Sequence, residues 1–185
     1  MILRKDAARN WQRIVAVGRE LVDDGVPLQL NEVARLAGVG VATVYRHFPT
    51  PEALLETIAT PSLESLVGHG EKALADDDPG RGLSDFLLHT IDAQVRDASL
   101  SPVAAAPVDT LLRTTELKIA LRTAGTHLLE RARAAGGVHA GLSSDDLIPL
   151  MCGIAFAAAA HGDDRAERAR TARRYLTLFL AGLRT

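Results

Sequence analysis

The sequence predicts an all-α protein, on three observations. Hydrophobic residues make up 47% of the 185 residues, and aromatic residues only 4%. The aliphatic share is dominated by Ala and Leu, which are strong helix formers, and so few aromatic side chains argue against a β-sandwich. Apolar residues recur every three or four positions in each long segment, which is the spacing of an amphipathic helix. The length suits one large domain or two small domains that share a core.

The first expected helix extends to about residue 24. Asp24-Gly25 ends it, because Gly25 suits the left-handed conformation that follows many helices. Two short helices follow, over about residues 31–37 and 41–48, with Gly38-Val39-Gly40 as a tight turn between them. The apolar positions of the first helix are Trp11, Ile14, Val15, Val17, Leu21 and Val22.

The fourth helix is expected to begin at Pro49-Thr50-Pro51. Thr50 can act as its N-cap, and Pro51 takes the first helical position, where a missing N–H costs nothing. This helix is expected to reach about residue 74, with a kink at Pro61. Further helices are expected after a loop at residues 76–80: over about residues 83–95, 111–135 and 143–160, and from Asp163-Asp164 onward.

Residues 31–48 form a candidate helix-turn-helix, because two short helices joined by a glycine turn and braced by a longer one make such a unit. The second short helix must stand clear to enter a major groove about 12 Å wide, and it needs an apolar underside to fix its angle. Val39, Val44 and Phe48 are interpreted as that underside. Their expected packing partners are Ile14, Leu21, Val33 and Leu36, and the outward face is left to Val41, Ala42, Thr43, Arg46 and His47.

The run from Asn31 to Phe48, with its frame from Arg13-Ile14 to Leu54-Leu55, resembles the DNA-binding signature of the TetR family of transcriptional regulators. The resemblance covers about residues 9–58. It implies a helix-turn-helix domain over residues 1–50 and a helical effector-binding and dimerisation domain over residues 51–185. It further implies a repressor that binds palindromic operator DNA as a homodimer and is released by a small-molecule effector.

The resemblance can be carried over position by position. It implies that Thr43, Tyr45 and His47 touch the DNA backbone or bases, and that Val41, Ala42 and Arg46 face base edges. Gln29 and Leu30 begin the second helix, whose N-terminus meets a phosphate. In two places the chain departs from the family: Pro51 replaces a common Lys, and Gly40 replaces a common capping Ser.

The basic residues near the N-terminus have two interpretations. Net charge is −2, so no global basic field indicates a nucleic-acid partner, although basic residues outnumber acidic ones within residues 1–50. Arg4, Lys5 and Arg9 therefore serve either as an arm that follows the DNA or as a solvated tail.

For the second domain, the family analogy implies an effector pocket and a dimer interface. A cavity lined by apolar residues and a few polar anchors would suit a small hydrophobic or amphipathic effector; the alternative is that the same residues are plain core. The candidate lining residues are Phe86, His89, Leu112, Thr115 and Phe156. The candidate dimer residues, within about residues 143–183, are Leu147, Leu150, Met151, Ile154, Phe156, Tyr175, Leu176, Phe179, Leu180 and Leu183.

Other classes of protein find little support in the sequence. Cys152 is the single cysteine, which excludes an internal disulfide and suits a reducing cytoplasm. The longest apolar stretch is far below the roughly 20 residues of a membrane span. The histidines are scattered without metal-ligand spacing, and no motif indicates a cofactor or catalysis. The alternatives left open are a DNA-binding dimer without a small-molecule effector and a helical enzyme.

Overall fold

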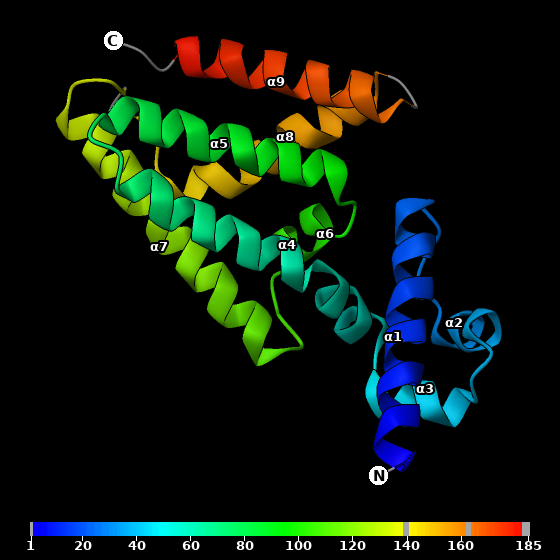
Figure 1. The fold of residues 1–185 in the computed structure, drawn as a ribbon. Helices are drawn as coiled ribbons and strands as arrows, with labels where there is room; N and C mark the ends of the chain where they lie inside the picture. The colour runs from blue at the N-terminus through cyan, green and yellow to red at the C-terminus, as the bar shows by residue number, and fades with distance from the viewer. Residues whose placement is uncertain (1, 139–140, 162–163, 183–185) are drawn as a thin grey trace.

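The computed structural model describes residues 2–138, 141–161 and 164–182, with side chains from residue 6 onward, and within these ranges it contains helices and no strand. The prediction of an all-α fold is therefore confirmed (Figure 1). The elements in chain order are α1 (Ile2–Asp23), α2 (Leu30–Ala37), α3 (Val41–His47), α4 (Pro51–Leu74), α5 (Pro79–Arg96), α6 (Leu100–Ala105), α7 (Leu112–Ala134), a 3-10 turn (Ser144–Asp146), α8 (Leu147–Ala159) and α9 (Arg165–Gly182).

Local signals at Gly25, Gly38 and Thr50 mark helix ends and a helix start where the sequence predicts them. Gly25 follows α1 with a φ of 71°, and Gly38 ends α2 with a φ of 61°, both in the left-handed region that glycine tolerates. Thr50 caps α4 by accepting a hydrogen bond from the Ala53 N–H. α4 then continues through Pro61 to residue 74, its predicted end.

The first three helices form a head around a small apolar core, at one end of α4 (Figure 1). α4 contributes to this core through Leu54 and Ile58, and further along it contributes Leu63 and Leu66 to a second core with α6 and α7. Since one helix serves both cores, the domain boundary after residue 50 stays a prediction. The buried residues of the head core are Ile14, Leu30, Val33, Ala34, Ala37, Val44, Phe48, Leu54 and Ile58.

One predicted packing partner in the head was wrong. Leu36 is 46% exposed rather than packed under α3. The buried side of α2 is occupied by Leu30, Val33, Ala34 and Ala37, and the helical repeat turns Leu36 outside that face.

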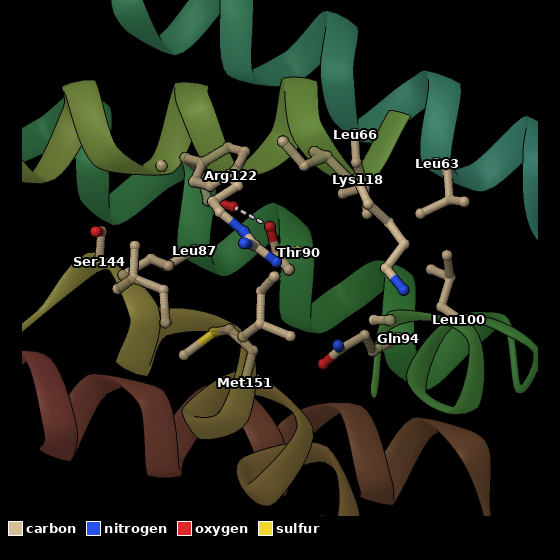
Figure 2. Close-up of a pocket in the computed structure, with 16 residues that line it drawn as sticks. Leu63, Leu66, Leu87, Thr90, Gln94, Leu100, Lys118, Arg122, Ser144 and Met151 are labelled. Atoms are coloured by element: carbon tan, nitrogen blue, oxygen red, sulfur yellow. Dashed lines mark hydrogen bonds between the residues drawn. The ribbon is translucent and has the colours of Figure 1, made fainter. Parts of the chain in front are cut away.

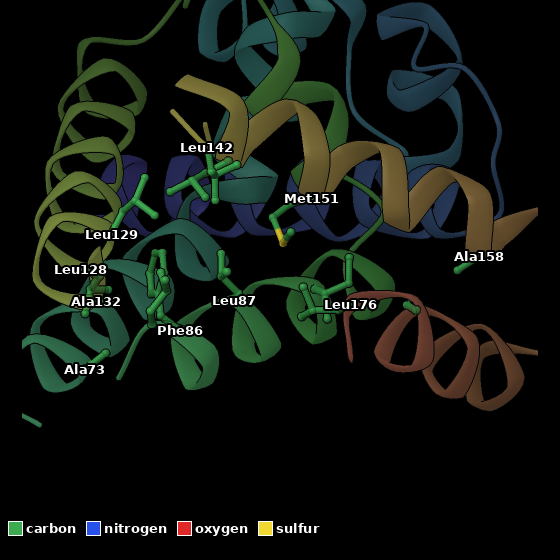
Figure 3. Packing of buried hydrophobic residues seen from close by; sticks show 14 residues of the cluster. Ala73, Phe86, Leu87, Leu128, Leu129, Ala132, Leu142, Met151, Ala158 and Leu176 are labelled. Carbon is green, nitrogen blue, oxygen red and sulfur yellow. The ribbon is translucent and has the colours of Figure 1, made fainter. Parts of the chain in front are cut away.

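The body is built around α5, which contacts α4, α7, α8 and α9 (Figure 1). Leu147, Met151 and Leu176, which the sequence suggested for the dimer interface, lie in this core instead (Figure 3). These three side chains pack against other residues of the same chain, because α8 and α9 lie against α5. The buried members of the core are Ala73, Leu83, Phe86, Leu87, Ile91, Leu128, Leu129, Ala132, Leu142, Leu147, Met151, Ala158, Ala172 and Leu176.

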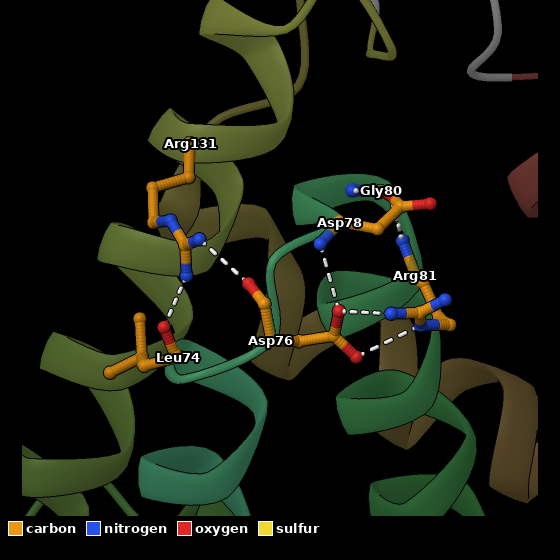
Figure 4. Close-up of polar contacts among 6 residues, drawn as sticks. All are labelled: Leu74, Asp76, Asp78, Gly80, Arg81 and Arg131. Carbon is orange, nitrogen blue, oxygen red and sulfur yellow. Dashed lines mark hydrogen bonds and ion pairs between the residues drawn. The ribbon is translucent and has the colours of Figure 1, made fainter.

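The acidic loop between α4 and α5 is a folded turn (Figure 4). Asp78 caps α5 by accepting from the N–H groups of Gly80 and Arg81, at 2.9 and 3.0 Å. Asp76 accepts from both sides of the Arg81 guanidinium, which lowers its pKa to about 2. Arg131 of α7 donates to the backbone oxygens of Leu74 and Asp76. These bonds fasten the end of α7 to the turn.

Within the described ranges, no helix combines the length and the apolar character required to span a bilayer.

Candidate DNA-recognition surface and effector cavity

α3 has a buried side and an exposed side. Val44 is fully buried and anchors the helix to the head, whereas Val41 and Tyr45 are each 46% exposed. Ala42 and Arg46 are also exposed, and the side chains of Thr43 and His47 are half-buried at the edges of this face. The imidazole of His47 packs beside Phe48, and its Nε2 has no hydrogen-bond partner.

The exposed face of the head contains free positive charge. Arg13 and Arg46 form no ion pair with any described residue, whereas Arg35 is engaged by Glu32, with Nε 2.8 Å from Oε2. Arg9 is exposed and lies 4.0 Å from Asp6. The side chains of Arg4 and Lys5 lie outside the described residues, so the proposed basic arm stays a prediction.

Gln29 and Leu30 occupy the start of α2 in different ways. Gln29 is exposed, with extended backbone, at the N-cap position, and its side chain makes no capping bond. Leu30 is buried in the head core, so its side chain faces away from solvent and only its backbone N–H lies at the helix end.

An inner cavity of about 70 Å³ lies inside the body, between α4, α5, α6, α7 and α8 (Figure 2). Its walls are mostly apolar, and Met151 and Leu147 of α8 close one side. Ligand pockets in proteins commonly measure about 300–1,000 Å³, so the cavity must expand to admit all but a small molecule. The lining residues are Leu63, Leu66, Phe86, Leu87, Thr90, Gln94, Leu100, Ala104, Lys118, Leu121, Arg122, Gly125, Ser144, Leu147, Ile148 and Met151.

An outer groove of about 540 Å³ adjoins the inner cavity. It lies between the segment that joins α6 to α7 and the start of α8, and it provides the space toward which the cavity can open. The residues that line both spaces are Ala104, Lys118, Arg122, Ser144 and Ile148.

The polar side chains of the cavity differ in how many of their donors and acceptors already have a hydrogen-bond partner. Lys118 donates to the oxygens of Val103 and Ala106 and to Oδ1 of Asp109, at 3.1, 2.9 and 2.7 Å, so all three of its donors are engaged. Thr90 donates to the Phe86 oxygen at 2.8 Å.

Two further polar groups retain unused hydrogen-bonding capacity. The guanidinium of Arg122 has no hydrogen-bond or ion-pair partner within the described ranges, although the backbone oxygen of this residue accepts from the Thr126 hydroxyl. Gln94 is 8% exposed, and its Oε1 is buried without a partner. Both residues line the cavity.

Comparison with known proteins identifies the architecture. A family model described as "Transcriptional regulator SbtR-like, C-terminal domain" matches residues 78–185, more than half of the chain. The chain belongs to the TetR family of bacterial regulatory proteins. The model for the DNA-binding part of that family matches residues 15–58. The chain is therefore a transcriptional regulator, and because TetR-family members are DNA-binding regulators and not enzymes, the helical-enzyme alternative falls away.

Individual proteins similar to this chain are also transcriptional regulators. The chain is 30% identical to the TetR transcriptional regulator SCO0520 from Streptomyces coelicolor, over 94% of this chain and 97% of that one, with a TM-score of 0.56. It is 27% identical to a TetR regulatory protein from Mycobacterium vanbaalenii, over 99% of each chain, with a TM-score of 0.51. An HTH-type transcriptional regulator of Staphylococcus aureus (strain USA300) is 35% identical over 77 residues, 40% of this chain. The match spans 41% of that relative's length.

The five candidate effector residues of this TetR-family protein do not share one cavity. Phe86 lines the inner cavity, and Thr115 lines the outer groove. Leu112 and Phe156 are 75% and 80% exposed. His89 faces a different depression, where its ring stacks on that of His69 with centroids 3.8 Å apart. The five residues are separated because they lie on different sides of their helices and because the chain before α7 runs along the surface. Their role in effector binding therefore stays a prediction.

Other lining residues were missed at the sequence level. Thr90 and Gln94 follow Phe86 at intervals of four residues, so all three lie on one side of α5. That spacing could have identified them. Met151, by contrast, was assigned to the dimer interface, and no local signal distinguishes a cavity wall from an interface on an apolar helix.

α8 and α9 also leave apolar side chains uncovered. Phe156 and Leu178 are 80% and 65% exposed, although their helices pack on each other and on the body. Leu183, another candidate dimer residue, lies outside the described residues.

Proposed function

We infer that this TetR-family regulator is a homodimeric repressor that binds palindromic operator DNA through α3 and releases it when a small molecule occupies the inner cavity. The observation that carries the proposal is the exposed face of α3, with Tyr45 and unpaired Arg46 on a helix anchored by Val44. The same fold would serve an activator, and the family resemblance favours repression.

The side chains of α3 suit a major groove. Val41 and Ala42 are small, so the start of the helix can approach base edges closely. Arg46 has the forked donors that recognise guanine, and Tyr45 and Thr43 carry hydroxyl groups able to bond phosphates. The exposed N-terminus of α2, at Gln29, is suited to bind a phosphate.

A homodimer follows from the uncovered apolar side chains of α8 and α9. Phe156 and Leu178 leave large apolar area in water, and such patches are typical of protein interfaces. Two heads in a dimer must place their α3 helices about 34–36 Å apart to occupy successive major grooves.

Effector release requires a path from the cavity to the head. α4 supplies it, because Leu63 and Leu66 line the cavity while Leu54 and Ile58 belong to the head core. A ligand that favours a different tilt of α4 changes the head spacing and weakens DNA binding by its differential affinity for the two states. Action on chromosomal DNA would place the protein in the cytoplasm.

The DNA-binding proposal is tested by selecting genomic fragments with purified protein. We expect the wild type to enrich a palindrome, and a Tyr45→Ala, His47→Ala double variant to lose it. Arg46→Ala should relax base preference at one position of each half-site, whereas Lys72→Ala, which removes an exposed charge from the body, should bind as the wild type does. No enrichment by the wild type at any salt concentration would refute the proposal.

The dimer is tested by the molar mass in solution. Phe156→Glu should shift the protein to a monomer in light scattering. Ile119→Glu is the matched control, because Ile119 is 60% exposed but lies on α7. A monomeric wild type, or a dimer that survives Phe156→Glu, would contradict the proposed interface.

A further inference from the structure

Among the residues that line the inner cavity, Gln94 holds the polar atom that is buried without a hydrogen-bond partner. Its side chain extends from α5 toward the space between α5 and α8, and Figure 2 shows it on the same cavity as Met151 and Thr90. The other end of the amide makes one weak contact, from Nε2 to the Cys152 sulfur at 3.5 Å. A buried acceptor in this state raises the free energy of the closed, empty cavity and favours any occupant that supplies a donor.

Thr90 and Lys118, two other polar residues of the cavity wall, already have their donors engaged. The hydroxyl hydrogen of Thr90 is donated within α5 to the Phe86 oxygen. The ammonium group of Lys118 donates to three oxygens, and its charge is balanced by Asp109, whose side chain is slightly more buried than that of Lys118. Among the lining residues, Gln94 therefore holds the buried acceptor that can gain a hydrogen bond without losing one.

The surroundings restrict the rest of the occupant. Most of the remaining wall is formed by aliphatic side chains and Met151, which favour an apolar body. Arg122 stands where the cavity meets the outer groove and carries a positive charge without a partner among the described residues. A cationic molecule would pass this charge at a cost, whereas a neutral one would not.

We propose that the inner cavity takes a mainly apolar molecule that bears a hydroxyl group and no positive charge, and that this hydroxyl donates a hydrogen bond to Oε1 of Gln94. Gln94 is thus a specificity-determining residue that distinguishes a hydroxylated ligand from a hydrocarbon of the same shape. This assignment rests on the proposed function of the cavity as the effector site.

The test uses 4-alkylphenols of increasing chain length and the matching hydrocarbons in which a methyl group replaces the hydroxyl. Binding to the full-length wild type is measured by isothermal titration and by the shift of the melting temperature. We expect each phenol that binds to do so roughly tenfold or more tightly than its hydrocarbon partner, because the hydrocarbon leaves Oε1 unpaired.

Two variants assign the preference to a residue. Gln94→Met keeps the length of the side chain and removes the acceptor, so the phenol should lose its advantage and the hydrocarbon should bind at least as well as to the wild type. Thr90→Val is the matched control from the same wall, and it should keep the preference because the hydroxyl it removes is already bonded within α5. Circular dichroism and binding to the selected operator establish that each variant is folded.

The outcomes separate the inference from the proposed function. Equal binding of phenol and hydrocarbon to the wild type, or a preference that survives Gln94→Met, would overturn the assignment of Gln94 and leave the cavity as a ligand site. Failure of the entire series to bind would remove the inner cavity as the effector site and would favour a DNA-binding dimer without a small-molecule effector.

Discussion

Arg19 of the DNA-binding head and Asp97 at the end of α5 form an ion pair, with Nη1 of Arg19 2.6 Å from Oδ1 of Asp97. Arg19 also donates to the backbone oxygen of Ile58 in α4, and Asp97 accepts from the hydroxyl groups of Ser62 and Ser99. The cluster therefore joins α1, α4 and the corner between α5 and α6. Gln94 and Leu100, three residues to either side of Asp97, line the inner cavity. The head is thus attached to the body beside the cavity wall.

Asp97→Ala should lower the free energy of unfolding by about 2–3 kcal/mol, because it leaves several donors without their charged acceptor. Burial alone would raise the pKa of Asp97, but the hydrogen bonds from Ser62 and Ser99 and the charge of Arg19 outweigh it and lower the pKa. Urea denaturation measures the loss. Asp92→Ala is the control, because the Asp92–Arg173 pair is more exposed and should contribute less than about 1 kcal/mol. Equal losses would contradict the structural role of Asp97.

His89 should make the protein less stable in mild acid. Burial, and then the neighbouring charge of His69, lower the pKa of His89 below its ordinary value. As the pH falls, the unfolded chain therefore binds a proton at His89 before the folded protein does. The contribution of His89 to the free energy of unfolding is complete above about pH 6.5, and it is lost as the pH falls through the folded pKa. Lys72 and Arg96 add to this effect, and Asp92 opposes it.

The measurement for His89 is the urea midpoint between pH 7.5 and pH 5. His89→Gln should flatten its dependence on pH, whereas His127→Gln, which changes an exposed histidine on α7, should not. If the urea midpoint of His89→Gln depended on pH as steeply as that of the wild type, His89 would not be a cause of the loss of stability in acid.

Glu56 holds the segment before α7 against α4. Glu56 is 4% exposed, and its carboxylate accepts from the backbone N–H groups of Thr110 and Leu111, at 2.6 and 2.8 Å. Glu56→Ala should cost about 2–4 kcal/mol, since two backbone donors lose a charged acceptor, and Glu56→Gln should cost less. Hydrogen exchange should become faster at Thr110 and Leu111 in the Ala variant. Glu71→Ala, an exposed change on the same helix, should leave both rates unchanged.

Two glycines should respond to alanine in opposite directions. A Cβ at Gly82 would lie 2.6 Å from the backbone oxygen of Ala73, so Gly82→Ala forces α5 away from α4 and should cost about 1–3 kcal/mol. A Cβ at Gly68, inside α4, would meet no atom within 4 Å, so Gly68→Ala should stabilise the protein by up to about 1 kcal/mol. Thermal melts of the two variants compare them directly. If Gly68→Ala lowered the melting temperature as much as Gly82→Ala does, packing around the added Cβ would not distinguish the two sites.

The sequence by itself determined the recognition unit and most of the helices, because these depend on neighbours within a few residues. It did not predict α6, and it placed the start of α5 about four residues too late. Gly25, Gly38 and Thr50 act through their own turn of chain, and the apolar spacing of α1 to α3 is visible without a partner. The tertiary structure decided which apolar faces were used within the chain. Met151 and Leu176 went to the core while Phe156 remained exposed, and His89 was paired with His69 and not with Phe86. Those outcomes depend on how α5, α7, α8 and α9 are placed in space, and a helical repeat carries no information on which other helix its apolar side will meet.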